Sequence, residues 1–257
     1  EKKFPFNIYL CSSYFNEVEI FAFKFIALSP YIHKFVLITS PNSVSNKISS
    51  NITFYPFEKI KAALGSRIYI ESIPLHGKTN IHRENEIRNN IKIALSHLEP
   101  PPDPNDIIII TDFDEFLLED GMDYIISNPP ETYYRIECYF FYYSFRWLIT
   151  SVKWVHPIVC RYKILDNNVI QSLWKSKQSP LKGAIGYHLS FFLNSPQRIR
   201  RKIVGYSHQF FNAEPFINLN HIYAKAACGI DVYNRVEKIK MVLNPPLNVT
   251  KYPYLKH

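Results

Sequence analysis

The sequence has 257 residues, of which 47% are hydrophobic and 20% are charged, so the chain can bury a large core and is not intrinsically disordered. Lys and Arg outnumber Asp and Glu by 30 to 22, and this excess favours an anionic partner such as a phosphate-bearing substrate, a nucleic acid or an acidic membrane surface, although a solubilising surface explains it equally well. The four widely separated cysteines exclude a dense disulfide framework and lack the spacing of zinc ligands.

The N-terminal third predicts alternating strands and helices. Residues 7–14 are typical of a strand, residues 16–28 of a helix with Asn16 as its N-cap, and residues 33–40 of the next strand. This order is a βαβ unit. Short strand candidates follow at 52–57 and 67–73.

The next segment predicts a long amphipathic helix and a buried strand. Residues 80–98 form the helix, whose apolar stripe comprises Ile87, Ile91, Ala94, Leu95 and Leu98. The sequence DIIIIT at 106–111 is continuously apolar after its first residue, which indicates a strand buried on both faces of a mainly parallel sheet.

The second half is rich in aromatic residues and predicts an α+β arrangement. Residues 132–148 and 153–165 are expected to be long β segments, and residues 195–208 a helix with Ser195 at the N-cap and Pro196 in the first turn. The basic residues of this helix are distributed around it, so they fit a solvated face as well as an anion site; they are Arg198, Arg200, Arg201 and Lys202.

An acidic cluster follows the buried strand directly. Side chains alternate along an extended chain, so Asp112 and Asp114 share one face, whereas Phe113 points into apolar packing. Ligands of open α/β sheets bind beyond the carboxyl ends of the strands. Because like charges repel unless a cation lies between them, the pair predicts a Mg²⁺ or Mn²⁺ site of the kind that carries phosphates.

Three interpretations of this D-x-D pattern compete. In the first, the acidic residues form a solvated loop at the end of the strand and have no role in binding or catalysis. In haloacid-dehalogenase-type phosphatases the first Asp is a nucleophile, but a small residue and a hydroxyl are expected where this chain has Glu115 and Phe116. In nucleotide-sugar glycosyltransferases of the GT-A fold, the motif holds a metal ion on the donor diphosphate.

The order of further motifs favours the third interpretation. They are HRENEIRNN (82–90), YFFYYSFRW (139–147), SPLKGAIGYHLSFF (179–192), RRKIVGYSHQFFN (200–212) and CGIDVYNR (228–235). Together with the D-x-D-E core, this order resembles glycosyltransferase family 17, the family of β-1,4-mannosyl-glycoprotein 4-β-N-acetylglucosaminyltransferases. The chain departs from the family pattern at Ala22-Phe23-Lys24, at Ile87 and at Tyr187.

The resemblance implies a GT-A-like, Rossmann-like α/β fold with a mainly parallel central sheet flanked by helices. We expect one domain over 1–257, with a nucleotide-sugar-binding half at about 1–130 and an acceptor-side half at about 131–257. The implied reaction is the inverting transfer of a sugar, expected to be GlcNAc from UDP-GlcNAc, to a glycan acceptor such as an N-glycan. Asp114 and Asp112 are the expected ligands of the metal ion, and the match at the Gly186-Tyr187-His188 step adds His188 as a ligand or phosphate contact.

Inversion also needs a general base on the acceptor side of the sugar. Asp231 matches an acidic position of the family and is our first candidate, with His188 as another; Glu115 either orients a neighbour, faces the acceptor or lies in solvent. Further candidates are Glu137, Glu214 and His208.

Donor contacts are expected on the helix at 80–98. Arg83 and Arg88 are candidates for the diphosphate because Arg binds phosphate in a bidentate manner, with surface ion pairing as the alternative. Asn89 is a candidate for the uracil or ribose.

Two other functions remain open, a metal-dependent phosphatase or phosphotransferase with Asp112 as nucleophile, and a degenerate carbohydrate-binding protein. No nucleic-acid-binding module is recognisable. No apolar run approaches the roughly 18 residues of a membrane span. We therefore expect a chain that is soluble as given, cytoplasmic if microbial or viral, and in the Golgi lumen if an anchor ahead of Glu1 has been removed.

Overall fold

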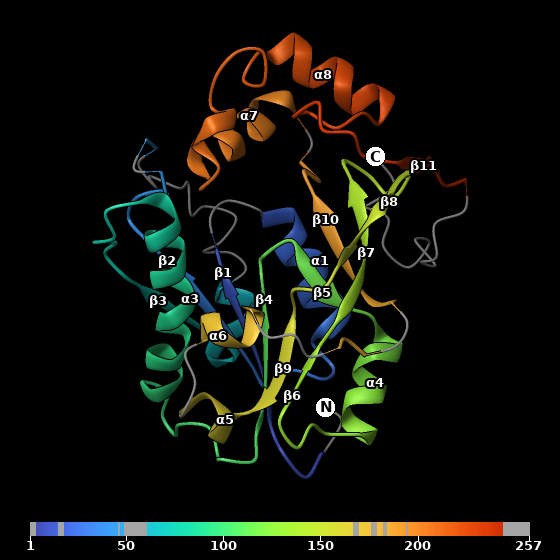
Figure 1. Cartoon of the computed structure of the whole chain (residues 1–257). Coiled ribbons are helices and arrows are strands. Elements are labelled where there is room, and N and C mark those ends of the chain that lie inside the picture. The colour runs from blue at the N-terminus through green and yellow to red at the C-terminus, as the bar shows by residue number, and fades with distance from the viewer. Residues whose placement is uncertain are drawn as a thin grey trace.

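The computed structural model describes residues 4–14, 18–45, 47–48, 61–166, 170–175, 179–181, 184–193 and 195–243. The fold is mixed α/β and contains two sheets (Figure 1). The predicted cap Asn16 and the strand candidate at 52–57 lie outside the described residues.

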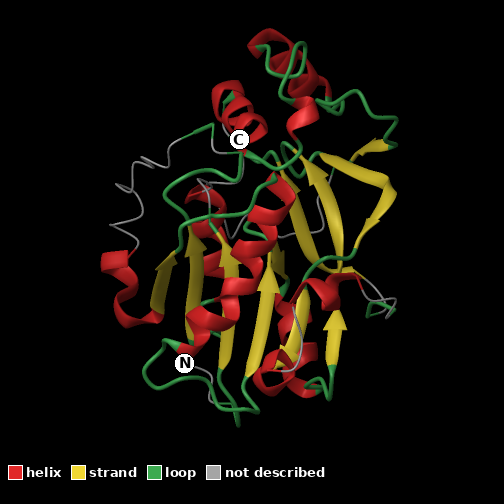
Figure 2. Cartoon of the chain, turned by 60° about the vertical axis from the view of Figure 1, so that its left-hand side comes forward, coloured by secondary structure: helices red, strands yellow, loops and turns green. Residues whose placement is uncertain are grey.

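The first sheet has six strands. In spatial order they are β3 (Ile68–Ser72), β2 (Lys34–Thr39), β1 (Ile8–Ser13), β4 (Ile107–Thr111), β9 (Ile158–Arg161) and β6 (Tyr133–Arg135). The first four are mutually parallel, and β9 runs antiparallel to both β4 and β6. The carboxyl ends of the four parallel strands meet at one edge, the upper edge in Figure 2.

The second sheet has five strands and adjoins this edge. In spatial order they are β11 (Ile239–Met241), β8 (Trp147–Trp154), β7 (Glu137–Tyr142), β10 (Ala184–Ser190) and β5 (Glu115–Leu117). The predicted long β segment at 132–148 is therefore divided, because Ile136 separates β6 in the first sheet from β7 in the second. The β segment expected at 153–165 was also wrong at its end, where the chain turns into a short helix.

The helices cover the sheet faces and the upper edge. They are α1 (Val18–Leu28), α3 (Asn80–Ser96), α4 (Glu119–Ser127), α5 (Tyr162–Asp166), α6 (Ile170–Lys175), α7 (Pro196–Gly205) and α8 (Leu219–Cys228). The side chain of Ser195 accepts a hydrogen bond from the backbone of Arg198, so the predicted N-cap of α7 is confirmed. In Figure 1, α7 and α8 lie together above the carboxyl edge.

The strand β4 is buried on both faces, as its sequence predicts. Ile107 and Ile109 join the core that also contains α1 and α4 residues, while Ile108 and Ile110 pack with the apolar stripe of α3. A strand packed on both sides cannot shift without exposing one of these layers. This packing fixes the position at which the acidic cluster emerges.

Two observations bear on the cellular setting. All four cysteines are free thiols, and three of them are buried. Among the helices of the described ranges, none combines the length and apolarity needed to cross a bilayer.

Candidate active site

The acidic cluster occupies the turn that joins β4 to β5, and so connects the two sheets. Asp112 and Asp114 are 9% and 7% exposed, and both line the same cavity. Phe113 stacks on Phe21 in the core, as predicted, but the chain forms a turn at 113–114 and is not extended there as the sequence argument assumed. The turn therefore presents two carboxylates together and is anchored by the aromatic ring between them.

Arg88 of α3 pairs with Asp112. Its Nη2 lies 3.1 Å and 3.0 Å from the two carboxylate oxygens of Asp112 and 2.8 Å from Oε1 of Glu84. Burial acts to lower the pKa of Arg88, but the charges of Asp112 and Glu84 raise it above its ordinary value. The guanidinium also lies over the ring of Trp174, so it is a fixed positive charge.

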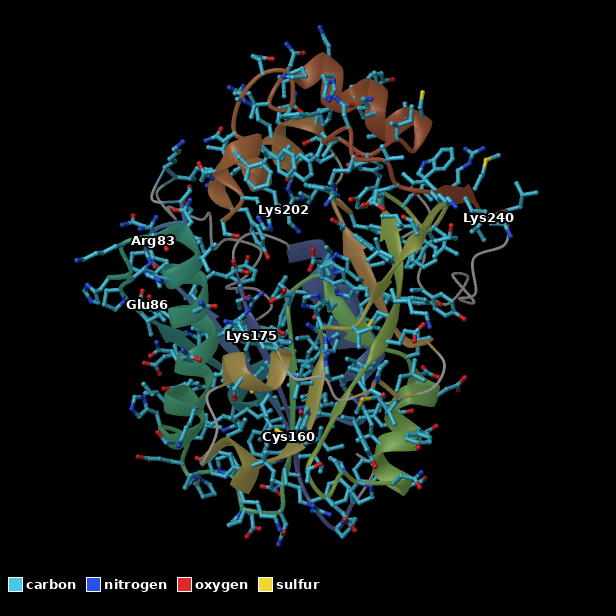
Figure 3. All side chains as sticks on the ribbon, viewed as in Figure 1. Arg83, Glu86, Cys160, Lys175, Lys202 and Lys240 are labelled. Atoms are coloured by element: carbon cyan, nitrogen blue, oxygen red, sulfur yellow. The ribbon has the colours of Figure 1, made fainter. Side chains whose placement is uncertain are left out.

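Lys202 of α7 pairs with Asp114. Its ammonium donates a hydrogen bond of 2.6 Å to Oδ2, while Nδ1 of His188 lies 3.5 Å from Oδ1. Burial acts to raise the pKa of Asp114, yet Lys202 and then His188 outweigh it, so the pKa is lowered and the carboxylate is ionised at neutral pH. Figure 3 shows Lys202 beneath α7, on the side that faces the sheets.

Glu115 stabilises the turn from the interior of the protein. It is completely buried, so the predicted possibility of a solvent-facing carboxylate is wrong. Its Oε2 accepts a hydrogen bond of 2.8 Å from the backbone of Asp112, and its Oε1 accepts one of 2.5 Å from the indole of Trp154. Burial, followed by the charges of Asp112 and Asp114, raises the pKa of Glu115 to about 8, and the two N–H donors offset this only in part.

Lys24 of α1 supports the same turn. The residue is 1% exposed, and its ammonium donates to Oγ of Ser12 at 2.9 Å, to Oγ1 of Thr111 at 2.6 Å and to the backbone oxygen of Asp112 at 3.2 Å. This lysine stands at one of the positions where the sequence departs from the family pattern. It fixes the strand ends from which the acids project.

His188 lies on β10 beside the acidic cluster. Its ring stacks on Trp154 with centroids 3.9 Å apart, and its Nδ1 is buried without a hydrogen-bond partner. Burial lowers the pKa of His188 to about 4, although Asp114 acts in the opposite direction. The imidazole is therefore neutral at pH 7 and has an unsatisfied polar atom directed at Asp114.

Two cavities meet at Asp112. The first cavity, of ≈ 500 Å³, lies over the ends of β1 and β2 and is lined by Ser13, Tyr14, Ser40, Asn42, Val44, Glu84, Ile87, Arg88, Asp112, Gly205 and Tyr206. The second cavity, of ≈ 650 Å³, lies under α7 and is lined by Asp112, Asp114, Phe140, Tyr142, Trp154, His188, Ser190, Phe191, Lys202, Tyr206, His208, Tyr233 and Arg235.

Two predicted donor-binding residues lie apart from the cluster. Arg83 donates to the backbone oxygens of Val44 at 2.5 Å and Gly77 at 2.7 Å and to the side chain of Asn80, so its guanidinium holds loops (Figure 3). Asn89 is exposed on α3. Neither Arg83 nor Asn89 lines either cavity.

Asp231 is placed behind the second cavity. It is 1% exposed and does not line that cavity. Its Oδ2 accepts from the backbone and Nε of Arg235 at 2.9 Å and 2.8 Å, and its Oδ1 accepts from Nη2 at 3.0 Å. Arg235 does line the cavity, so Asp231 contacts a residue of the cavity wall without lining the cavity itself.

The charge pairing bears on the predicted metal ion. Each D-x-D carboxylate has a protein cation within 3.0 Å, Arg88 at Asp112 and Lys202 at Asp114. Within the part of the chain that the structure describes, no group of three or more His, Cys, Asp or Glu side chains is arranged to hold a metal. A divalent ion does not fit this arrangement, because it would adjoin the guanidinium of Arg88, which Asp112 shares with Glu84, and the ammonium of Lys202.

Sequence reasoning did not assign Lys202 or Trp154 to the acidic cluster. Lys202 follows Ile199 by three positions and precedes Ile203, both of which are buried, so helical spacing does place it toward the core face. Nothing in the sequence near Trp154 indicates a contact with Glu115. Its role arises because β8 and β5 belong to one sheet, which only the tertiary fold determines.

Comparison with known proteins gives one extensive match. The sequence model of glycosyltransferase family 17 matches residues 2–238, nearly the whole chain. No curated protein sequence is significantly similar.

Similar solved structures include the inositol-1-phosphate CTP transferase from T. maritima, with 9% identity, a TM-score of 0.36 and coverage of 72% of this chain and 84% of that chain. The structure of HddC from Yersinia pseudotuberculosis has 7% identity and a TM-score of 0.36, and the match covers 72% of this chain and 89% of that chain. Both similarities are too weak to carry an argument.

Proposed function

Since this chain belongs to glycosyltransferase family 17 and is a glycosyltransferase, we propose that it moves GlcNAc from UDP-GlcNAc to a glycan acceptor with inversion at the anomeric carbon. The observation that carries the proposal is Asp112, which lies at the carboxyl edge of the parallel strands and lines both cavities. A donor that spans the two cavities would pass this residue. We also propose that the fold is GT-A-like, with the donor half at about 1–130 and the acceptor half at about 131–257.

The first cavity suits the nucleoside of the donor. It lies over the ends of β1 and β2, where open α/β sheets bind ligands, and hydroxyl and amide groups of Ser13, Ser40 and Asn42 line it. Arg88 lines this cavity together with Asp112, to which it is hydrogen-bonded, so its guanidinium lies near a diphosphate at the junction of the two cavities. Because Arg88 is largely buried, its electrostatic interaction with a phosphate group would be stronger than that of an arginine on the surface.

The second cavity suits the transferred sugar and the acceptor. Its walls include the rings of Phe191 and Tyr233, which are candidates for contact with pyranose rings. Arg235, fixed by Asp231, adds hydrogen-bond donors at its rim. The acceptor hydroxyl must lose a proton, and among Asp231, Glu115 and His188 only His188 lines this cavity.

The inverting step needs two contributions from these residues. The bond from the anomeric carbon to the diphosphate breaks, and its electron pair stays on the diphosphate, where Arg88 and Lys202 stabilise the charge. The acceptor oxygen forms the new bond from the opposite face, and its proton passes to His188, whose conjugate acid Asp114 would stabilise at 3.5 Å. The divalent ion predicted from D-x-D has no part in this scheme, because protein cations already hold both carboxylates.

A screen of UDP release tests this function. The chain is incubated with a panel of nucleotide sugars, with and without oligosaccharide acceptors, and release of the nucleoside diphosphate is measured. We expect UDP-GlcNAc to be the best donor and an acceptor to increase the rate. Failure to release UDP from any donor, or phosphate release from phosphomonoesters dependent on Asp112, would instead favour the phosphatase interpretation.

A further inference from the structure

The ammonium of Lys202 occupies the position at Asp114 that a metal ion would be expected to take. We propose that this lysine is the diphosphate-binding cation of the enzyme and that transfer proceeds without a divalent metal ion. The inference rests on the proposed nucleotide-sugar transfer and concerns the group that neutralises its leaving diphosphate.

Lys202 is held at the wall of the second cavity, next to Asp114. Its side chain is 13% exposed, its Nζ lies 2.6 Å from Oδ2 of Asp114, and it lines the second cavity beside Asp112. The helix that carries it is held by Ile199 and Ile203, which are buried in a core shared with β7 and β8. The ammonium also lies 5.7 Å and 6.0 Å from the ring centroids of Phe191 and Tyr206. The cation is therefore held in place before any ligand binds.

Protein cations lie at both carboxylates of the D-x-D pair. Two buried aspartates need compensating positive charge, and this need is the physical basis of a D-x-D metal site. Here Arg88 lies 3.0 Å from Asp112 and shares its charge with Glu84 at 2.8 Å, and Lys202 lies 2.6 Å from Asp114. A divalent ion would have to displace at least one of these cations, and each is held by further contacts with aromatic rings.

Arg88 and Lys202 can stabilise the charge that develops on the leaving diphosphate. When the donor C–O bond breaks, its electron pair remains on the diphosphate, which becomes the free UDP anion. An ammonium has three N–H donors, so Lys202 can hold Asp114 and a phosphate oxygen together. Arg88 binds the same group from the first cavity, and both residues stay protonated throughout, so no additional reactant is required.

UDP binding and UDP release in the presence of chelator test the proposal. The full chain is treated with EDTA, and both quantities are compared with samples that contain added Mn²⁺. We expect the UDP affinity and the rate of UDP release to agree within about twofold between these conditions. A loss of roughly 10-fold or more in EDTA that Mn²⁺ restores would overturn the inference while leaving the transferase function intact. Absence of UDP binding under both conditions would overturn the proposed function and, with it, this inference.

Variants of α7 supply the second measurement. We expect Lys202→Met to weaken UDP binding roughly 10- to 100-fold in EDTA, since a charge-assisted hydrogen bond is lost, and Lys202→Arg to recover most of it. Arg200→Met is the matched control, because Arg200 is exposed on the same helix and lines neither cavity. Unchanged UDP binding in a folded Lys202→Met variant, verified by circular dichroism, would also overturn the inference.

Discussion

The indole Nε1 of Trp154 donates a hydrogen bond of 2.5 Å to Oε1 of Glu115, across 39 positions of the sequence. Trp154 lies at the end of β8 and Glu115 at the start of β5, and the ring that makes this bond also stacks on His188. One tryptophan thus connects the buried acid to the imidazole of the second cavity. The acid is placed to maintain the turn that carries Asp112 and Asp114, so its effects should be seen in stability as well as in activity.

We predict that Glu115 makes stability fall as pH rises. Its pKa is about 8 in the folded protein against an ordinary value of 4.5, so between these values the folded state holds a proton that the unfolded state has lost. His188 acts in the opposite direction only below pH 6.5, which leaves pH 6.5–8 as the informative window. Glu115→Gln should remove a slope of up to roughly 1.4 kcal/mol per pH unit there.

Thermal unfolding across pH 6.5–8 measures this slope. The single amide oxygen of the Glu115→Gln variant cannot replace both carboxyl oxygens as acceptors for the two N–H donors, so the variant should also be less stable at the low end of the window, by about 1–3 kcal/mol. Glu131→Gln, at an exposed position, is the control and should retain the native slope. An equal slope in the Glu115 variant would show that this carboxyl does not titrate in the window.

Removal of Arg88 should affect both stability and donor use. Arg88→Met leaves Asp112 without its partner, and we expect a loss of about 1–3 kcal/mol in unfolding free energy. We also expect kcat/KM for UDP-sugar turnover to fall at least roughly 10-fold, with Arg88→Lys intermediate because a lysine cannot reproduce the guanidinium geometry. Asn89→Ala provides the comparison: an equal loss there would place the donor on the exposed face of α3, as the sequence predicted for Asn89.

His188→Gln should act on the chemical step. If His188 takes the acceptor proton, its loss should lower kcat by roughly 10²- to 10⁴-fold and leave UDP affinity within a few fold. The comparison is His208→Gln, which changes the other histidine of the second cavity, one that is exposed. If His188→Gln and His208→Gln lower kcat by the same small factor, another group accepts the proton.

Asp231→Asn should behave like a change in Arg235. Asp231 contacts this arginine through both oxygens and does not line the second cavity, so we expect a higher KM for the acceptor, by roughly 10-fold, with kcat largely retained. Arg235→Met should reproduce this effect, and the double variant should be no worse than either single one. A selective loss of kcat in Asp231→Asn would instead return Asp231 to the role of general base.

Gly186→Ala should destabilise the second sheet. A Cβ at this position would lie 2.7 Å from Sγ of Cys138 and 2.9 Å from the backbone oxygen of Phe116. Since β10 is paired with β7 on one side and β5 on the other, neither neighbour can move away without breaking the ladder. We expect a loss of about 1–3 kcal/mol in chemical denaturation. Gly65→Ala is a useful contrast, because there the strain comes from a φ of +55° and no atom lies within 4 Å of the added carbon.

Much of the architecture around β4 could be predicted because its causes are local. A run of isoleucines predicts burial on both faces, and the place of Phe113 between Asp112 and Asp114 predicts an apolar anchor between two acids, although a turn and not an extended strand arranges them. The N-cap of α7 follows from Ser195 and Pro196 in the same way. Each of these features depends on residues within a few positions of one another, where backbone geometry alone determines which side chains share a face.

The mixed α/β class, the buried strand, the acidic cluster and the similarity to glycosyltransferase family 17 could all be inferred from the residues alone. The side chains that meet the turn could not, because Arg88 from α3, Lys202 from α7 and Trp154 from β8 come from segments between 24 and 88 positions away from their acidic partners. The buried carboxylates of Asp112 and Asp114 require compensating positive charge, but this requirement does not specify which residues provide it. The packing of β5 against β10, and the position of α7 above them, bring Lys202 to Asp114.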